Sequence, residues 1–402
     1  MKTTILLSTF TLAIAAYAQQ INFNLNAQVF DYGQNIVAIE LETKDLKLNE
    51  NELNKKLFKV RAKGQLPIDV RQNKVVGVFD TQRNIEQISL TENGNILLTL
   101  ESGKDIIGAN TLAYVSGDIN RNLLLNLDYQ LVLQHPISNL PQDSEFQQQK
   151  TVDHEVDLFS PKVSKQQIQY QFYQPQNAEG KRPLIIWLHG NGEGGYADYQ
   201  NNRSQILANR GAVTFVTPQT QQIFGGAYVI APQAPDTWYN NYSKGYIQKM
   251  KSLIDEVVAE HAIDPERIYL FGASAGGYMA LRMLIEYPNL FAAANVSAPA
   301  LDRAVVAGGQ PTTAEDLQKI KHKPLWLVHA TNDPTISYSA TSKRVFEELR
   351  DSGVILTAYP EVKIGDQEYN GHWSWIYSLR NMPINPQGDS LFQWMAKQKL
   401  GN

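Results

Sequence analysis

Residues 267–277 read Arg-Ile-Tyr-Leu-Phe-Gly-Ala-Ser-Ala-Gly-Gly, an apolar stretch that runs directly into the pattern G-x-S-x-G. A helix-forming stretch, residues 278–287, follows at once. A chain that turns from a strand into a helix within so few residues strains the backbone at the serine, and only small neighbours such as Gly272 and Gly276 tolerate the crowding. The hydroxyl of Ser274 is thereby held out over the edge of a sheet. We therefore predict that Ser274 is a nucleophile.

Short apolar segments of strand type lie on both sides of this turn, at residues 184–188, 228–230, 268–271, 325–329 and 354–359. Helical patterns lie between them. In the clearest pattern, apolar residues recur at steps of three and four: Ile247, Met250, Leu253, Ile254, Val257 and Val258. Alternating strands and helices predict an α/β fold with a mostly parallel sheet that is covered on both faces.

The chain before this region has a different pattern. Residues 125–134 alternate apolar and polar side chains with a period of two, and shorter segments of strand type occur at residues 36–41, 75–79 and 96–100. Turn-forming residues separate these segments at the spacing of a sandwich. We predict a small β-sandwich over residues 19–135, a linker over the proline- and glutamine-containing residues 136–150, and the α/β domain over residues 151–402.

The first 18 residues have the pattern of a secretory signal peptide. Lys2 precedes an apolar run, and Ala16-Tyr17-Ala18 forms a small-x-small cleavage site. We therefore expect a secreted or periplasmic protein that is cleaved near Ala18. The chain contains no cysteine, which excludes disulfides, a thiol nucleophile and a lipid anchor on cysteine. Its net charge of −4 argues against nucleic acid or an anionic membrane as a partner.

A serine hydroxyl needs a base to take its proton, and the base needs a carboxylate to fix its tautomer. A serine at a strand-to-helix turn is typical of the α/β-hydrolase fold, in which the acid and then the histidine follow the serine. Three histidines follow Ser274. His322 lies in a basic surface turn and His329 lies inside a strand, where a buried core histidine is the usual reading. His372 lies in a loop after the last predicted strand, and we predict it to be the base.

Asp333 is the predicted acid. It follows the strand at residues 325–329 by a short turn, at the carboxyl end of the sheet where such sites gather. Glu361 and Asp366 also lie between Ser274 and His372 and remain alternatives.

A tetrahedral intermediate places negative charge on the former carbonyl oxygen, and backbone N–H groups must bind it. One donor is expected from Ala275, directly after the nucleophile. The second is expected from the glycine-rich loop at residues 189–195, where we favour the amide of Asn191 and keep that of Gly190 as the alternative. This loop lacks the Gly-Lys-Ser/Thr ending of a phosphate-binding loop.

Aromatic residues gather near these loops. Trp238 and Trp373 are predicted to contact substrate, because flat aromatic faces suit a sugar ring or an aryl acid, with plain packing as the alternative. Residues 301–318 are either a lid over the site or a surface insertion.

Several of these segments resemble those of secreted bacterial α/β-hydrolases similar to carbohydrate esterases, poly(hydroxybutyrate) depolymerases and prolyl-oligopeptidase-like peptidases. The shared segments are residues 183–195, 229–235, 263–269, 272–277 and 371–375. The resemblance implies the same roles for the serine, acid, histidine and oxyanion amides named above. Some esterases of this kind carry an immunoglobulin-like domain ahead of the catalytic domain, and residues 35–41 are similar to the start of that domain.

The expected function is that of a secreted serine hydrolase that cleaves carboxylic esters through an acyl-enzyme. Acetyl or feruloyl groups on carbohydrate or small alcohols are the expected substrates, with plant or microbial polysaccharide among the candidates. A prolyl-oligopeptidase-like serine peptidase and a non-catalytic binding protein on a hydrolase fold are the alternatives. No cofactor and no metal are expected, since the sequence has no ligand spacing such as H-E-x-x-H. The oligomeric state and the role of the first domain stay open.

Overall fold

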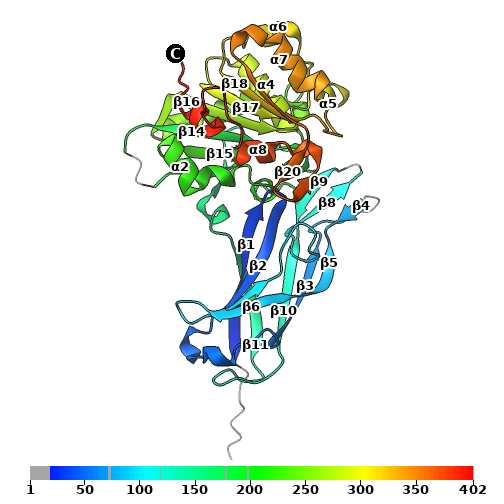
Figure 1. Cartoon of the computed structure of the whole chain (residues 1–402), viewed down its shortest axis with the longest axis vertical. Coiled ribbons are helices and arrows are strands. Elements are labelled where there is room, and N and C mark those ends of the chain that lie inside the picture. The colour runs from blue at the N-terminus through cyan, green and yellow to red at the C-terminus, as the bar shows by residue number, and fades with distance from the viewer. Residues whose placement is uncertain (1–18, 71–73, 118, 177–178, 197–198, 402) are drawn as a thin grey trace, which may run out of the picture.

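The computed structural model describes residues 19–70, 74–117, 119–176, 179–196 and 199–401. The predicted signal peptide, residues 1–18, lies outside these ranges. The described chain has two parts, which we call the N-terminal β region (residues 20–152) and the C-terminal α/β region (residues 153–401); Figure 1 shows the first below the second. Among the helices in the described ranges, none is long and apolar enough to cross a membrane.

The N-terminal β region is built from three sheets. The largest has five strands in the order β11 (Glu145–Val152), β1 (Gln20–Phe30), β2 (Gly33–Leu41), β7 (Ile96–Leu100) and β6 (Ile85–Leu90). A second sheet contains β10 (Asn126–Leu133), β3 (Phe58–Gln65) and β5 (Phe79–Arg83). The third contains β4 (Lys74–Val76), β8 (Leu112–Ser116) and β9 (Arg121–Leu124).

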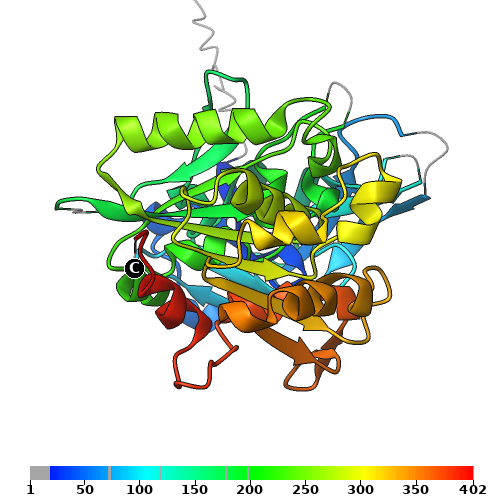
Figure 2. The same cartoon turned by 90° about the horizontal axis from the view of Figure 1, so that it is seen from above.

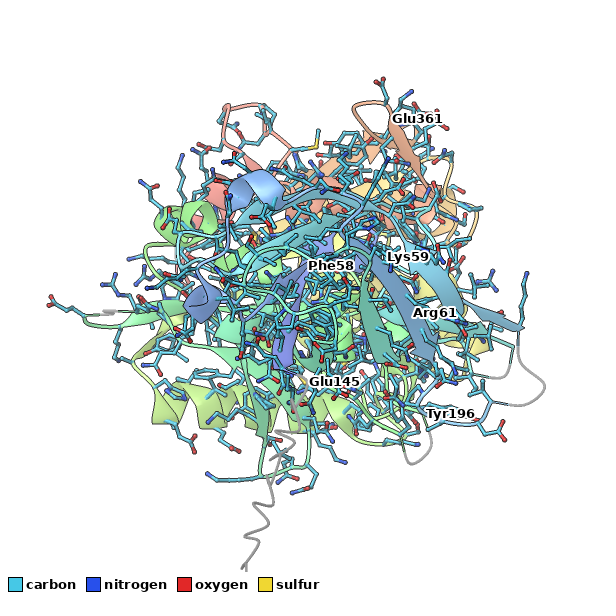
Figure 3. The ribbon with its side chains drawn as sticks, turned by 90° about the horizontal axis from the view of Figure 1, so that it is seen from below. Phe58, Lys59, Arg61, Glu145, Tyr196 and Glu361 are labelled. Atoms are coloured by element: carbon cyan, nitrogen blue, oxygen red, sulfur yellow. The ribbon has the colours of Figure 1, made fainter. Side chains whose placement is uncertain are left out.

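One hydrophobic core joins the five-stranded sheet and the sheet of β10, β3 and β5. Strand β3 shows the period-two pattern that produces it, because Phe58 is buried and the next residue, Lys59, is exposed, as is Arg61 two positions further on. Figure 3 labels these three residues in a view from below. Phe23 and Leu98, on β1 and β7, belong to the same core as Phe58. The N-terminal β region therefore has its own apolar interior.

The linker predicted at residues 136–150 is wrong as a structural assignment. Its residues 145–150 lie in β11, which pairs in parallel with β1, with Gln20 opposite Glu145. The polar composition of this segment reflects a strand with much of its surface exposed. Phe146 nevertheless packs edge-on against Phe58, with ring centroids 5.6 Å apart. Strand β11 is thus part of the five-stranded sheet, although the sequence predicts that the sandwich ends at residue 135.

The C-terminal α/β region is organised around an eight-stranded sheet. Its strand order is β12 (Ser160–Val163), β13 (Gln169–Tyr173), β15 (Tyr228–Pro232), β14 (Arg182–Leu188), β16 (Ile263–Ala273), β17 (Ala293–Ser297), β18 (Leu325–Ala330) and β19 (Ile355–Tyr359). The strands from β15 to β19 pair in parallel, whereas β12 and β13 pair antiparallel at one edge. A hairpin of β20 (Val362–Ile364) and β21 (Gln367–Tyr369) follows.

Helices cover both faces of this sheet, as the sequence pattern predicts. They are α1 (Ser204–Leu207), α2 (Pro218–Phe224), α3 (Tyr246–Glu260), α4 (Ala275–Glu286), α5 (Leu301–Val306), α6 (Ala314–Gln318), α7 (Arg344–Glu348), α8 (Trp375–Leu379) and α9 (Leu391–Ala396). Along β14, Ile186 packs into the core that contains α3 and α4, whereas Trp187 packs into the core that contains α2 and α9. Figure 2 shows α3 and α9 on opposite sides of the sheet. Coverage of both faces explains why the central strands are apolar at nearly every position.

Candidate active site

Ser274 lies at the turn between β16 and α4. Its backbone has φ of 54° and ψ of −117°, a strained conformation for a residue with a side chain. A Cβ atom on Gly272 would lie 2.4 Å from the carbonyl oxygen of Gly276, and one on Gly276 would lie 2.0 Å from that of Leu188. Both glycines are therefore required by the close packing of α4 against β16 and β14. The serine hydroxyl is held at the carboxyl end of the central strands.

Three side chains form a hydrogen-bonded row at this turn. The Ser274 Oγ lies 2.9 Å from the His372 Nε2, and the His372 Nδ1 lies 2.8 Å from the Asp333 Oδ2. His372 lies in a short 3-10 helix (Gly371–Trp373) after the β20–β21 hairpin, and the Asn370 side chain caps that helix by accepting a hydrogen bond from the His372 N–H. The structure thus brings together three residues that are distant in sequence, in the geometry a serine nucleophile requires.

The Asp333 side chain is fully buried and receives hydrogen bonds on both oxygens. Its Oδ1 accepts from the backbone N–H groups of Thr335 at 2.7 Å and Ile336 at 2.9 Å. Its Oδ2 accepts from His372 and also from the His329 Nε2 at 3.0 Å. Burial by itself would raise the pKa of Asp333, but the hydrogen bonds from His329 and His372 outweigh it and hold the pKa well below its ordinary value. Asp333 is therefore ionised at neutral pH.

His329 is a site residue that the sequence did not reveal. It was predicted to be an ordinary strand histidine, and it is indeed fully buried in β18. Its Nδ1 accepts a hydrogen bond from the Ser342 Oγ at 2.9 Å, which directs the Nε2–H to Asp333. The spacing of four residues between His329 and Asp333, across the end of one strand, was the only signal in the sequence.

We call residues 189–195 the oxyanion loop. A Cβ atom on Gly190 would lie 3.8 Å from the Cβ of Ser274, so the loop passes directly beside the nucleophile. The amides of Asn191 and Ala275 each begin a helical turn and have no acceptor in the described part of the chain, which leaves both N–H groups available to a ligand. The backbone of Gly190, in contrast, lies against the carboxyl group of Glu193 and acts to lower its pKa.

His189 anchors the start of the oxyanion loop. Its Nε2 accepts a hydrogen bond from the Ala234 N–H at 3.0 Å, and its Nδ1–H donates to the Gly190 carbonyl at 2.6 Å. Complete burial lowers the pKa of His189 to about 3, so the ring is neutral. A neutral imidazole with one donor and one acceptor matches both partners.

The two predicted substrate-contact aromatics have different positions. Trp238 is completely buried and lies against His189, with ring centroids 5.2 Å apart, so the prediction that it contacts substrate is wrong. Its sequence position near the loops reflects packing beneath them. Trp373 is partly exposed next to His372 and remains a predicted contact. Trp375 packs edge-on against His372 at 5.2 Å.

A groove of about 520 Å³ is lined in part by residues around Asp333, whereas Ser274 and His372 are not among its lining residues. Its lining includes Asp333 and, from the segment predicted to be a lid or an insertion, Asp302, Arg303 and Val306 on α5. Val306 is 85% exposed although it is apolar. Tyr338 also lines the groove. Residues 301–318 therefore include α5 and α6, of which α5 borders the groove.

A scan against family models matches residues 168–349 to the family described as Esterase PHB depolymerase. Among characterised proteins, the poly(3-hydroxyalkanoate) depolymerase C of Paucimonas lemoignei is 29% identical over 142 residues, which is 34% of this chain and 30% of the relative. The bifunctional acetylxylan esterase/xylanase of Neocallimastix patriciarum is 28% identical over 166 residues, 41% of this chain and 21% of the relative. The chain thus spans less than half the length of these relatives.

Among solved structures, the crystal structure of a thermostable esterase superposes with a TM-score of 0.73 at 24% sequence identity. The superposition covers 94% of this chain and 99% of that structure, so it includes the N-terminal β region. The expected α/β-hydrolase fold is confirmed by this likeness. Taken with the family match, the comparisons support an esterase-like α/β-hydrolase.

Proposed function

We propose that this protein hydrolyses carboxylic esters through an acyl-enzyme on Ser274, with His372 as the general base and Asp333 as the acid that orients it. The observation that carries the proposal is the row of hydrogen bonds from Ser274 through His372 to Asp333, at 2.9 and 2.8 Å. The match to an esterase family over residues 168–349 supports an ester as the substrate.

The reaction follows from this geometry. The Ser274 Oγ attacks the ester carbonyl carbon while its proton passes to the His372 Nε2, and Asp333 stabilises the resulting imidazolium. The amides of Asn191 and Ala275 bind the oxyanion of the tetrahedral intermediate. His372 then returns the proton to the departing alcohol, which leaves the acyl group on Ser274. Water repeats the sequence, with His372 again as base, and releases the acid.

Acetyl and feruloyl esters of carbohydrates are the substrate class we propose first. Relatives named as an acetylxylan esterase and as polyester depolymerases support a search among polysaccharide and polymer esters. Secretion, inferred from the pattern of residues 1–18, belongs to the same proposal, and mass measurement of the exported protein would locate the cleavage near Ala18.

Hydrolysis of p-nitrophenyl acetate by the purified protein and by Ser274→Ala tests the proposal. The variant should lose about 10⁴-fold or more in kcat. Equal turnover by both proteins would exclude the proposed catalysis and favour a binding protein. Faster cleavage of peptide amides than of aryl and sugar esters would indicate a peptidase.

A further inference from the structure

The N-terminal β region reaches the oxyanion loop through two neighbouring side chains of β9, Arg121 and Asn122. The Asn122 Nδ2–H donates to the Glu193 Oε1 at 2.8 Å. The Arg121 Nε–H donates to the carbonyl of Gly195 at 3.0 Å, and its Nη2–H donates to that of Asp236 at 2.8 Å. Figure 1 shows β8 and β9 at the end of the N-terminal β region that meets the C-terminal α/β region. The contacts therefore join two parts of the chain that are distant in sequence.

These contacts hold the backbone of the loop closely. A Cβ atom on Gly192 would lie 3.1 Å from the Asn122 Nδ2, and one on Gly194 would lie 1.9 Å from the carbonyl oxygen of Asp236. Arg121 is only 7% exposed, so its two hydrogen bonds to the loop and to Asp236 are shielded from water. Loops rich in glycine are mobile unless other groups fix them. Here the fixing groups come from the N-terminal β region.

Glu193 connects this contact to the nucleophile. Its side chain is buried, with one oxygen bound to Asn122. Its other oxygen, Oε2, lies 3.1 Å from the position of a Cβ on Gly190, which itself lies beside Ser274. Burial raises the pKa of Glu193, while its hydrogen bond from Asn122 and the charge of Arg121 act in the opposite direction. A buried carboxyl of this kind must keep its partners, because losing one leaves it unsatisfied.

We propose that Arg121 and Asn122 are positioning residues for the oxyanion loop, acting through Glu193, so that the N-terminal β region forms part of the catalytic apparatus. The inference rests on the proposed ester hydrolysis. Oxyanion donors act on the transition state rather than on the bound substrate. A loop that loses Asn122 should therefore bind substrate as before but stabilise the intermediate less well.

Asn122→Ala tests this inference against Asn126→Ala, a matched control at an exposed asparagine of β10. Steady-state turnover of p-nitrophenyl acetate is measured per active site, counted by complete reaction with a fluorophosphonate. We expect Asn122→Ala to lower kcat about tenfold with KM nearly unchanged, and to weaken inhibition by phenylboronic acid, whose anionic adduct occupies the oxyanion site, by a similar factor. In a Glu193→Ala background, adding Asn122→Ala should have little further effect.

Other outcomes would overturn the inference. If kcat and boronate affinity are unchanged in Asn122→Ala, the contact between Asn122 and Glu193 is purely structural. The same conclusion follows if the variant loses only melting temperature or the number of titratable sites. Hydrogen exchange provides a readout that needs no turnover: amides in residues 189–195 should exchange faster in Asn122→Ala than in Asn126→Ala, and equal exchange would contradict the inference. Failure of the ester assay by the wild-type protein itself would instead refute the proposed function.

Discussion

Two buried carboxyl groups flank the nucleophile, and they are supported in opposite ways. Asp333, on the histidine side, receives hydrogen bonds from two histidines and two backbone amides of the C-terminal α/β region, and its pKa is held low. Glu193, on the oxyanion side, receives its side-chain hydrogen bond from Asn122 of the N-terminal β region, and burial keeps its pKa high. The comparison shows that a different effect prevails at each group: burial outweighs the hydrogen bonds at Glu193, whereas the hydrogen bonds from two histidines outweigh burial at Asp333.

The comparison also separates two kinds of support. The serine side of the site is built around one sheet, since Ser274 follows β16 and Asp333 follows β18, with β17 between these two strands, and His372 follows the β20–β21 hairpin. The oxyanion side depends on a second part of the chain. Changes on the first side should therefore affect proton transfer, whereas changes on the second should affect the positions of backbone donors.

The largest effect in this comparison is expected for Asp333→Asn. An amide removes the negative charge that stabilises imidazolium and favours the wrong tautomer of His372, so kcat should fall by about 10³- to 10⁴-fold. The fold should survive, because the side-chain shape is kept. Steady-state kinetics with p-nitrophenyl acetate and a circular dichroism spectrum measure both. Activity within tenfold of the wild type would mean that Glu361 or Asp366, or no carboxylate, fills this role.

A smaller effect is expected for His329→Leu, which removes one donor from Asp333 and replaces the imidazole with an apolar side chain of similar size. Losing a hydrogen bond to a charged group costs about 1.5–3 kcal/mol, so we expect about a tenfold or greater fall in kcat. His329→Gln retains an N–H donor and should recover part of the loss. Kinetics per titrated active site compare the two variants, and equal losses in both would argue that His329 only fills space.

The smallest effect is expected from the titration of Glu193, which should make the stability of the fold depend on pH. The pKa of Glu193 in the folded chain is raised above its ordinary value of 4.5, so its contribution to stability is fully present below about pH 4.5 and is lost as the pH rises through the folded pKa. Glu193→Gln removes this titration while keeping an acceptor for Asn122. The wild type should therefore lose stability relative to Glu193→Gln as the pH rises from 4 to 8.

Urea unfolding at the two pH values measures this difference, with Glu92→Gln, at an exposed glutamate, as the control. A constant difference between wild type and Glu193→Gln at both pH values would show that burial does not perturb the group. A change of the opposite sign would place Glu193 with Asp333 as a stabilised ion, and the contrast between the two carboxyl groups would disappear.

The parts of the site with local signals were predictable from the sequence. Ser274 lies in a turn whose glycines are required by contacts within a few residues or between neighbouring strands. Asp333 and His372 were predicted from their order in the chain after the serine. In the structure His372 lies within hydrogen-bonding distance of both Ser274 and Asp333.

The parts that depend on distant contacts were not predictable. A buried histidine in a strand, such as His329, has the same sequence pattern whether it fills space or binds a carboxylate. Trp238 lies beneath the loops rather than on them, and β11 is an edge strand whose polar side chains resemble a linker. Arg121 and Asn122 contact the oxyanion loop only because the two parts of the chain pack together, and no periodicity records that packing.

Trapping the acyl-enzyme is the most direct test of catalysis by Ser274. The protein is mixed with excess p-nitrophenyl acetate, quenched in acid within the first turnovers, digested and analysed by mass spectrometry. We expect one acetyl group on the peptide that contains Ser274 in the wild type. In His372→Ala this acetyl group should form more slowly, and in Ser274→Ala it should be absent. Two results would contradict catalysis by Ser274. One is hydrolysis of the ester by the wild type and by His372→Ala with no acetyl group at Ser274. The other is an acetyl group on a different residue that turns over at the rate of kcat.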